Sequence, residues 1–153
     1  MLKGLPTAFW TLVAGLVLAA PLHAAPGPLT VKDAWSRATV PGAQTGALFF
    51  EVDNSGAADE LVAVEGKVSR LVEMHESTME GGMMRMRPVA HVVVPAHGVL
   101  RFRPGSYHVM LVDLARPLVA GQHFSVTLRF RNAGAITTEA TVRELGDDGS
   151  GSH

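Results

Sequence analysis

A histidine and a methionine in the C-terminal half of the chain stand at a spacing suited to holding one metal ion together. Only Val109 separates His108 from Met110. In a β-strand residues i and i+2 point to the same face, so this imidazole and this thioether would leave the sheet side by side. Thioethers are poor ligands for zinc, calcium or magnesium but suit Cu(I), and imidazole accommodates copper as well. The pair therefore predicts half of a Cu(I) site.

The other half is predicted from an upstream stretch that is rich in methionine. Five of the seven methionines of the chain lie between Met74 and Met86. A lone methionine is usually a pliable core filler, but this stretch is polar and contains Gly81 and Gly82, so it does not resemble core. We expect His75 and one of these methionines to close the site from a neighbouring strand or loop. Three further methionines of this stretch are interpreted either as loop residues that cover the metal site or as residues that capture an incoming ion: Met79, Met83 and Met84.

The composition excludes several other kinds of chemistry. The chain has no cysteine, which removes thiol nucleophiles, disulfides, iron–sulfur clusters, cysteine-ligated zinc and the cysteine-centred blue-copper site. Thirteen basic against fourteen acidic residues give a formal charge of -1 without a basic block, so nucleic acid is not an expected partner. Ser106, His108 and Asp113 are the residue types of a hydrolase triad. Asp113 would face away from His108 in a strand, and no nucleophile elbow is present, so we do not expect an enzyme.

Residues 1–25 have the features of an export signal. Lys3 supplies a positive charge, Ala8 to Ala20 form an apolar run of thirteen residues, and Ala24 and Ala25 offer small residues for cleavage. The run is short of the roughly 20 residues that span a bilayer, so no stable membrane insertion is expected after cleavage, with an uncleaved anchor as the alternative. No cysteine follows the run, so a lipid anchor on cysteine is not expected either. The predicted location is the bacterial periplasm.

The rest of the chain has the pattern of a single all-β domain over residues 26–145. Short apolar or alternating runs are separated by turn residues, and no window of twelve or more residues keeps a helical stripe. Residues 146–153 are mostly Gly, Asp and Ser and are expected to form a disordered tail. The predicted strands are Leu29–Arg37, Gly46–Asp53, Glu60–Val64, Leu71–His75, Met84–Val89, His91–Val94, Val99–Phe102, Tyr107–Leu114, Phe124–Phe130 and Ile136–Arg143.

The spacing of the candidate ligands resembles a known family signature. Ten residues lie between His75 and Met86, twenty-one between Met86 and His108, and one between His108 and Met110. This pattern, H-x10-M-x21-H-x-M, is similar to that of the periplasmic PCuAC copper chaperones. The similarity extends over most of the chain after the signal, from Ala34-Trp35-Ser36-Arg37-Ala38 to Leu128-Arg129-Phe130.

The resemblance implies a fold, a ligand set and a role. The fold would be a cupredoxin-like Greek-key β-sandwich, and Cu(I) would be bound by His75, Met86, His108 and Met110. The protein would deliver copper toward the Cu(A) centre of cytochrome c oxidase, with the Cu(A) subunit and Sco-type thiol proteins as partners. One departure is His97, which stands where relatives usually carry glycine. A second is that the chain ends soon after the last predicted strand, so a second high-capacity copper site is not expected.

Other functions remain open at this stage. The same ligands would serve a protein that sequesters copper or silver without delivering it. In a non-metal β-sandwich the methionines would only pack. An electron-transfer cupredoxin is disfavoured because it needs a cysteine thiolate. We expect the remaining histidines of the predicted domain to be solvated: His91, His97 and His123. For His97 the alternative is a weak secondary contact with copper.

Overall fold

The computed structural model describes Gly4 and residues 27–147 and is built from β-strands. Within this part of the chain no helix is long and apolar enough to cross a membrane. Apart from Gly4, the predicted signal peptide lies outside the described residues, as do residues 148–153 of the predicted tail. The strands are β1 (Leu29–Arg37), β2 (Thr45–Asn54), β3 (Asp59–Gly66), β4 (Ser69–Glu80), β5 (Met83–Pro88), β6 (Val92–Val94), β7 (Gly98–Phe102), β8 (Tyr107–Leu114), β9 (His123–Phe130) and β10 (Gly134–Arg143).

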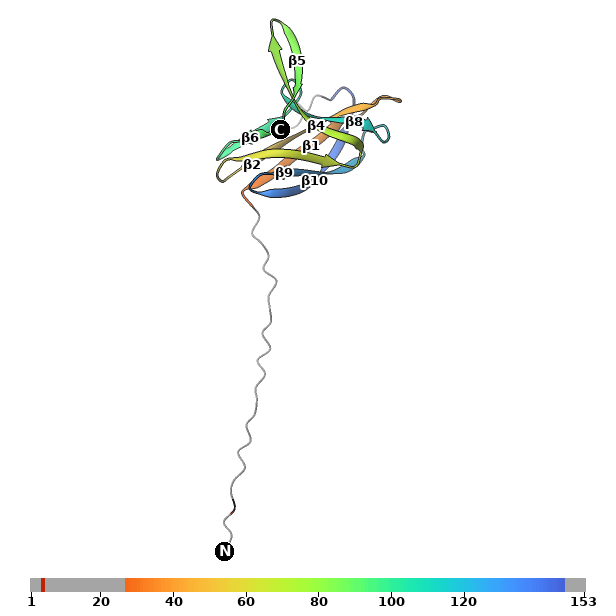
Figure 1. Ribbon diagram of the computed structural model, residues 1–153. Helices are drawn as coiled ribbons and strands as arrows, with labels where there is room; N and C mark the ends of the chain where they lie inside the picture. The colour runs from red at the N-terminus through yellow and green to blue at the C-terminus, as the bar shows by residue number, and fades with distance from the viewer. Residues whose placement is uncertain (1–3, 5–26, 148–153) are drawn as a thin grey trace.

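The strands form one continuous ladder that folds over on itself as a sandwich (Figure 1). Their order is β5-β4-β8-β7-β2-β1-β10-β9-β3-β6, with an additional pairing of β8 with β2. Strands that are far apart in this order also contact each other across the sandwich, namely β3 with β4 and β6 with β7. Each predicted strand is present, and the predicted all-β class is confirmed.

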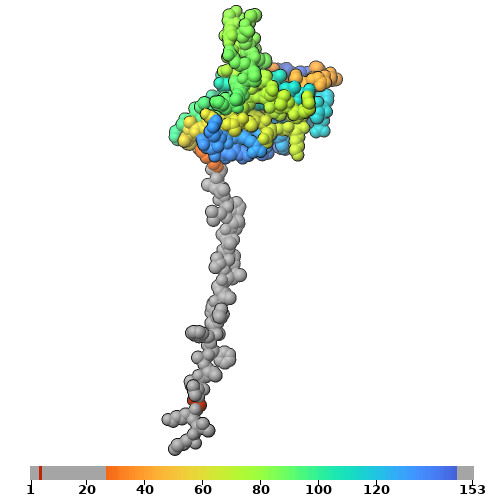
Figure 2. Space-filling model, viewed as in Figure 1, coloured from red at the N-terminus to blue at the C-terminus, as the bar shows by residue number. Residues whose placement is uncertain are grey.

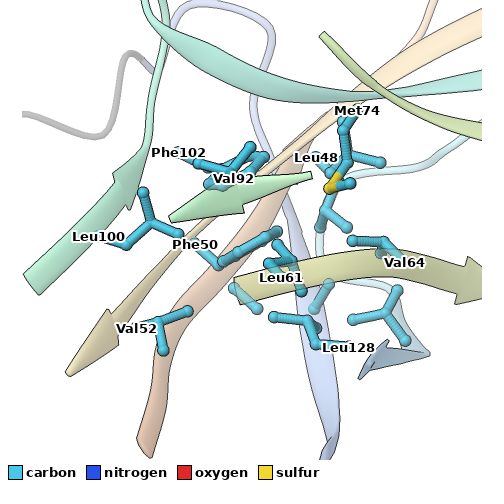
Figure 3. Close-up of a cluster of buried hydrophobic side chains, with 14 of the residues drawn as sticks. Leu48, Phe50, Val52, Leu61, Val64, Met74, Val92, Leu100, Phe102 and Leu128 are labelled. Atoms are coloured by element: carbon cyan, nitrogen blue, oxygen red, sulfur yellow. The ribbon is translucent and has the colours of Figure 1, made fainter. Parts of the chain in front are cut away.

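The core lies between the two layers and follows from the period-2 alternation of the strands. On β2, Leu48, Phe50 and Val52 all point inward and are almost fully buried. The ring of Phe50 stacks on that of Phe102, with centroids 4.4 Å apart. Figure 3 shows this cluster, into which Met74 reaches from β4. Burying one such side chain contributes about 1.5–3 kcal/mol, so the core is the main source of stability.

A second, smaller apolar contact lies on the opposite face of β1 and β2. Trp35 and Phe49 are buried, but they are not part of the main core cluster, and their ring centroids are 4.6 Å apart. The guanidinium carbon of Arg143 lies 4.7 Å from the Trp35 ring centroid and covers it. On β2, Ala47 lies on this same outer face and is the register partner of Met110. The outer face beside Met110 is therefore partly apolar.

One hairpin projects from the sandwich. Strands β4 and β5 are joined at Gly81 and Gly82, whose φ angles are 59° and 80°. Positive φ at both central residues is what a two-residue type I′ turn requires, and glycine adopts it without a Cβ clash. Figures 1 and 2 show the hairpin as a ridge standing clear of the body. The strand predicted to end at His75 thus continues to Glu80, because pairing with β5 satisfies its backbone.

Candidate metal centre

The four predicted ligands lie on one face of three adjacent strands. His75 on β4 is the register partner of His108 on β8, and Met110 stands two residues further along β8. Met86 on β5 is the register partner of Ser77, which stands two residues after His75 on β4. Directly paired residues, and residues two apart on one strand, share a face. The fold therefore brings the four side chains to the outer face at the base of the hairpin.

His108 is the most buried member of the set. Its residue exposure is 5%. Nδ1 lies 3.3 Å from the carbonyl oxygen of Ser106, a contact in which an Nδ1–H donates to the carbonyl. In that tautomer Nε2 keeps its lone pair, and this buried atom has no hydrogen-bond partner. A buried polar atom without a hydrogen-bond partner destabilises the fold, so its presence calls for an explanation. A role of Nε2 as a metal ligand provides one.

The surroundings of His108 also favour the neutral ring that metal binding needs. Burial lowers the pKa of His108 below its ordinary value of 6.5, and nearby His75 lowers it further. The contact with the Ser106 carbonyl works in the opposite direction without reversing the shift. An imidazole must be deprotonated to ligate, so the lowered pKa reduces the competition from protons.

His75 is held by a carboxylate on its own strand. Its Nε2 lies 3.1 Å from Oε2 of Glu73, and the His75 side chain is 16% exposed. The two imidazole centroids, of His75 and His108, are 5.6 Å apart at an interplanar angle of 54°. An Nε2–H that donates to Glu73 leaves the Nδ1 lone pair of His75 free. Such a carboxylate–histidine pair fixes the ring orientation and makes the other nitrogen a better ligand.

The two thioethers differ in exposure. Met110 is half-buried and is paired with Glu73 across β8 and β4. Met86 is 59% exposed on β5 of the projecting hairpin. Met110 is thus anchored to the body, whereas Met86 is open to solvent. A partner molecule can reach Met86 more easily than the other three side chains.

The donor set selects against hard metal ions. Among residues 27–147 and Gly4, no group of three or more His, Cys, Asp or Glu side chains is placed to hold a metal. What the fold gathers is two imidazoles and two thioethers, groups that bind a metal as neutral donors. Soft, neutral donors favour Cu(I) over zinc, calcium or magnesium.

The other sequence candidates lie apart from this centre. Asp113 binds the guanidinium of Arg70, so it does not complete a triad with His108 and Ser106. His97 has a φ of 48° and donates its backbone N–H to Gly56, at the end of β2 remote from Ala47, which pairs with Met110. This left-handed backbone explains why glycine suits the position of His97.

Two positioning contacts were not predicted from the sequence. Glu73 contacts the His75 ring through its carboxylate. Its position two residues before His75 on one strand was the signal that could have identified it. The Ser106 carbonyl contact of His108 carries no side-chain signature at all.

Comparison with known proteins decides the family. Residues 29–142 match the family model described as "Putative lipoprotein LpqE-like". The chain belongs to the LpqE-like family. Within the curated proteins, it is 31% identical over 117 residues to "Putative lipoprotein Lxx21020" of Leifsonia xyli subsp. xyli (strain CTCB07), covering 75% of this chain and 69% of that protein.

Solved structures similar to this LpqE-like chain include PCuAC domains. The apo PCuAC domain from PmoF1 superposes with a TM-score of 0.67 at 26% identity, covering 77% of this chain and 95% of that domain. The copper-bound PCuAC domain from PmoF2 gives 0.66 at 27% identity, with coverages of 79% and 97%. The solution structure of CuI-DR1885 from Deinococcus radiodurans gives 0.64 at 29% identity, with coverages of 80% and 82%. The predicted cupredoxin-like fold is confirmed by these matches.

Proposed function

We propose that this protein is a periplasmic copper chaperone that binds one Cu(I) through His75, Met86, His108 and Met110. The observation that carries the proposal is the buried Nε2 of His108, which has no hydrogen-bond partner and stands on the face shared by the other three side chains. Two of the similar solved structures are copper-bound, one of them described as a Cu(I) form, which supports copper as the ion.

The site combines firm holding with access. His108 and Met110 belong to a strand that is paired on both sides, by β4 and by β2, so they are rigidly placed. Met86 is exposed, so an incoming ligand can replace this thioether before the others. An ion held by three anchored donors and one exchangeable donor can pass to a partner by successive ligand replacement.

The proposed recipient is the Cu(A) centre of cytochrome c oxidase, with Sco-type thiol proteins as further partners. A thiolate is a stronger soft donor than a thioether, so transfer to a thiol-bearing site runs downhill for Cu(I). Residues 1–25 would direct the chain to the periplasm, residues 26–145 would form the copper-binding domain, and residues 146–153 would be a tail.

The first test is an anaerobic Cu(I) titration of residues 26–153 in competition with a coloured Cu(I) chelator. We expect one tight equivalent in the parent. His108→Ala and Met86→Leu should each weaken Cu(I) binding at least about tenfold, because even residues that only orient ligands cost about 10–100-fold. The matched controls are His123→Ala, an exposed histidine of β9, and Met83→Leu, an exposed methionine on the other face of the hairpin. Equal affinity in all five proteins would refute the ligand assignment.

Delivery is tested separately from binding. The copper-loaded protein is mixed with a metal-free Cu(A) domain, and the rate of Cu(A) formation is compared with that from a small-molecule Cu(I) complex. A chaperone should accelerate the transfer. A protein that binds Cu(I) tightly but slows the transfer is instead a sequestration protein for copper or silver.

A further inference from the structure

The hairpin has two chemically different faces. One face carries Met79, Met84 and Met86, because Met79 is the register partner of Met84, and Met84 stands two residues before Met86 on β5. The opposite face carries charge, since Glu80 forms ion pairs with Arg85 and Arg87. The thioether face continues along β4 to His75, so it leads from the hairpin tip to the candidate metal centre.

The register brings the paired side chains close. In a two-residue type I′ hairpin the residues that flank the turn, here Glu80 and Met83, form a hydrogen-bonded pair. The next pair, Met79 with Met84, is therefore of the non-hydrogen-bonded kind, in which the Cα atoms are about 4.5 Å apart and the side chains are closest. Met86 is the diagonal neighbour of Met79 at roughly 7–8 Å, still within reach of long side chains.

Packing does not account for these methionines. Met79 is 65% exposed, Met84 is 56% exposed and Met86 is 59% exposed. None belongs to the core cluster or to the partly buried residues packed against it. Three flexible thioethers on one face of a projecting ribbon, in a chain without cysteine, form a soft-donor cluster that is open to solvent.

We propose that Met79, Met84 and Met86 form a second, outer site for a soft monovalent cation, through which Cu(I) is loaded into the inner site. This inference deepens the proposed function and rests on it for the destination of the ion. Met86 belongs to both sites. An ion held by Met79, Met84 and Met86 moves inward when the imidazole of His75 replaces one outer thioether and that of His108 replaces the next.

The step is a ligand exchange and needs no co-reactant. Each Cu–S bond that breaks is replaced by a Cu–N or Cu–S bond, the copper stays Cu(I), and no proton is released by a neutral ring. Three thioethers provide fewer and weaker donors than the inner set with its two imidazoles. The outer site should therefore bind more weakly, which directs the ion inward.

The test follows each methionine directly by NMR of the protein carrying carbon-13 methionine methyl groups. Silver(I) serves as the probe, since it shares the charge and softness of Cu(I) without oxidising in air. We expect the first equivalent to shift the methyl signals of Met110 and Met86, and a second equivalent to shift those of Met79 and Met84. The second equivalent should bind more weakly, because Met86 is then shared with the ion of the inner site. Met83, exposed on the charged face, is the internal control and should stay unshifted.

A double variant separates capture of the ion at the outer site from its binding at the inner site. In the double variant Met79→Leu with Met84→Leu the weaker equivalent should disappear, loading of Cu(I) from a chelator should slow, and the final Cu(I) affinity should equal that of the parent. Met83→Leu should load at the parent rate. Unshifted Met79 and Met84 signals, or unchanged loading in the double variant, would overturn the outer site.

The same titration keeps the two proposals distinguishable. If Met110 shifts while Met79 and Met84 do not, the outer site is wrong and the inner site stands. If Met79, Met84 and Met86 shift while Met110 does not, the outer site stands and the proposed inner ligand set is wrong. If no methionine signal moves, both are wrong.

Discussion

His108 carries the most information of any single residue. It is buried, its Nδ1 is engaged by the Ser106 carbonyl, and its Nε2 has no partner. A histidine kept only for packing would have both ring nitrogens satisfied or solvated, because an unpaired buried nitrogen costs about 1–3 kcal/mol. The site therefore trades some stability of the metal-free protein for a nitrogen that is ready to bind.

This trade predicts a pH dependence of stability. Burial lowers the pKa of His108 below 6.5, with a further contribution from His75, whereas the ring in the unfolded chain titrates near its ordinary value. Below about pH 6.5 the unfolded state binds more protons than the folded state. The free energy of unfolding therefore decreases as the pH is lowered through this range. Urea unfolding of the metal-free protein between about pH 7.5 and about pH 5.5 should show this slope.

The comparison variant is His108→Leu, which should have a smaller slope in that range, while His123→Leu should keep the parent slope. An equal slope in all three proteins would mean that His108 is not the group whose protonation destabilises the fold.

At the scale of the element, Asp59 ties two parts of the sandwich together. It begins β3, is 7% exposed, and its carboxylate accepts backbone N–H groups from Asn132 and Ala133 after β9, at 2.9 Å each. Burial alone would raise the pKa of Asp59, but the backbone donors of Asn132, Glu60 and Ala133 and the charge of Arg131 outweigh it and lower the pKa. The ionised carboxylate thus fixes the β9–β10 turn against β3.

Removing this charge should loosen the connection. Asp59→Asn presents an amide N–H to backbone donors, so we expect a loss of about 1–3 kcal/mol in the free energy of unfolding. Because the pKa is lowered in the folded state, the contribution is present above the ordinary aspartate pKa and is lost as pH falls through the folded value. The matched control is Asp53→Asn, whose exposed ion pair with Lys32 should contribute little. Equal losses in the two variants at neutral pH would contradict this role.

The strands were predictable from sequence to the extent that turn residues bound them. Leu29–Arg37 and Tyr107–Leu114 are found with the predicted bounds, because clear alternation and flanking turn residues define them. The extension of β4 beyond His75 was not predicted because residues 76–80 are polar or exposed on both faces, so the buried-face alternation of a half-buried strand is absent. Its pairing comes instead from the Gly81-Gly82 turn.

The candidate site shows the same division. The same-face placement of His108 and Met110 follows from strand geometry alone. The pairing of His75 with His108 depends on the register between β4 and β8, which is set by core residues such as Met74 and Val109 rather than by the ligands. No local pattern in the sequence contains that register.

At the scale of the whole molecule, the core and the site are built on opposite faces of the same strands. Met74 and Val109 point into the core, whereas their neighbours His75 and His108 point outward. The fold is therefore stabilised by burial that does not depend on metal, and the projecting hairpin can change its contacts without opening the core. A metal carrier needs this separation, since it must stay folded both with and without its ion.

Because the core and the metal site lie on opposite faces, we can predict how metal binding changes the melting temperature of the protein. Met86→Leu alters an exposed side chain, so the melting temperature of the metal-free protein should equal that of the parent. Silver(I) at a free concentration of about 100 times the Kd should stabilise the parent by about 2.7 kcal/mol, since it binds the folded site and not the unfolded chain. Met86→Leu should show a smaller rise in melting temperature at the same silver concentration, whereas Met83→Leu should show the full rise. If all three proteins gained the same stability, silver would be acting away from the face that Met86 shares with His108, and if none gained any, the face would hold no ion at all.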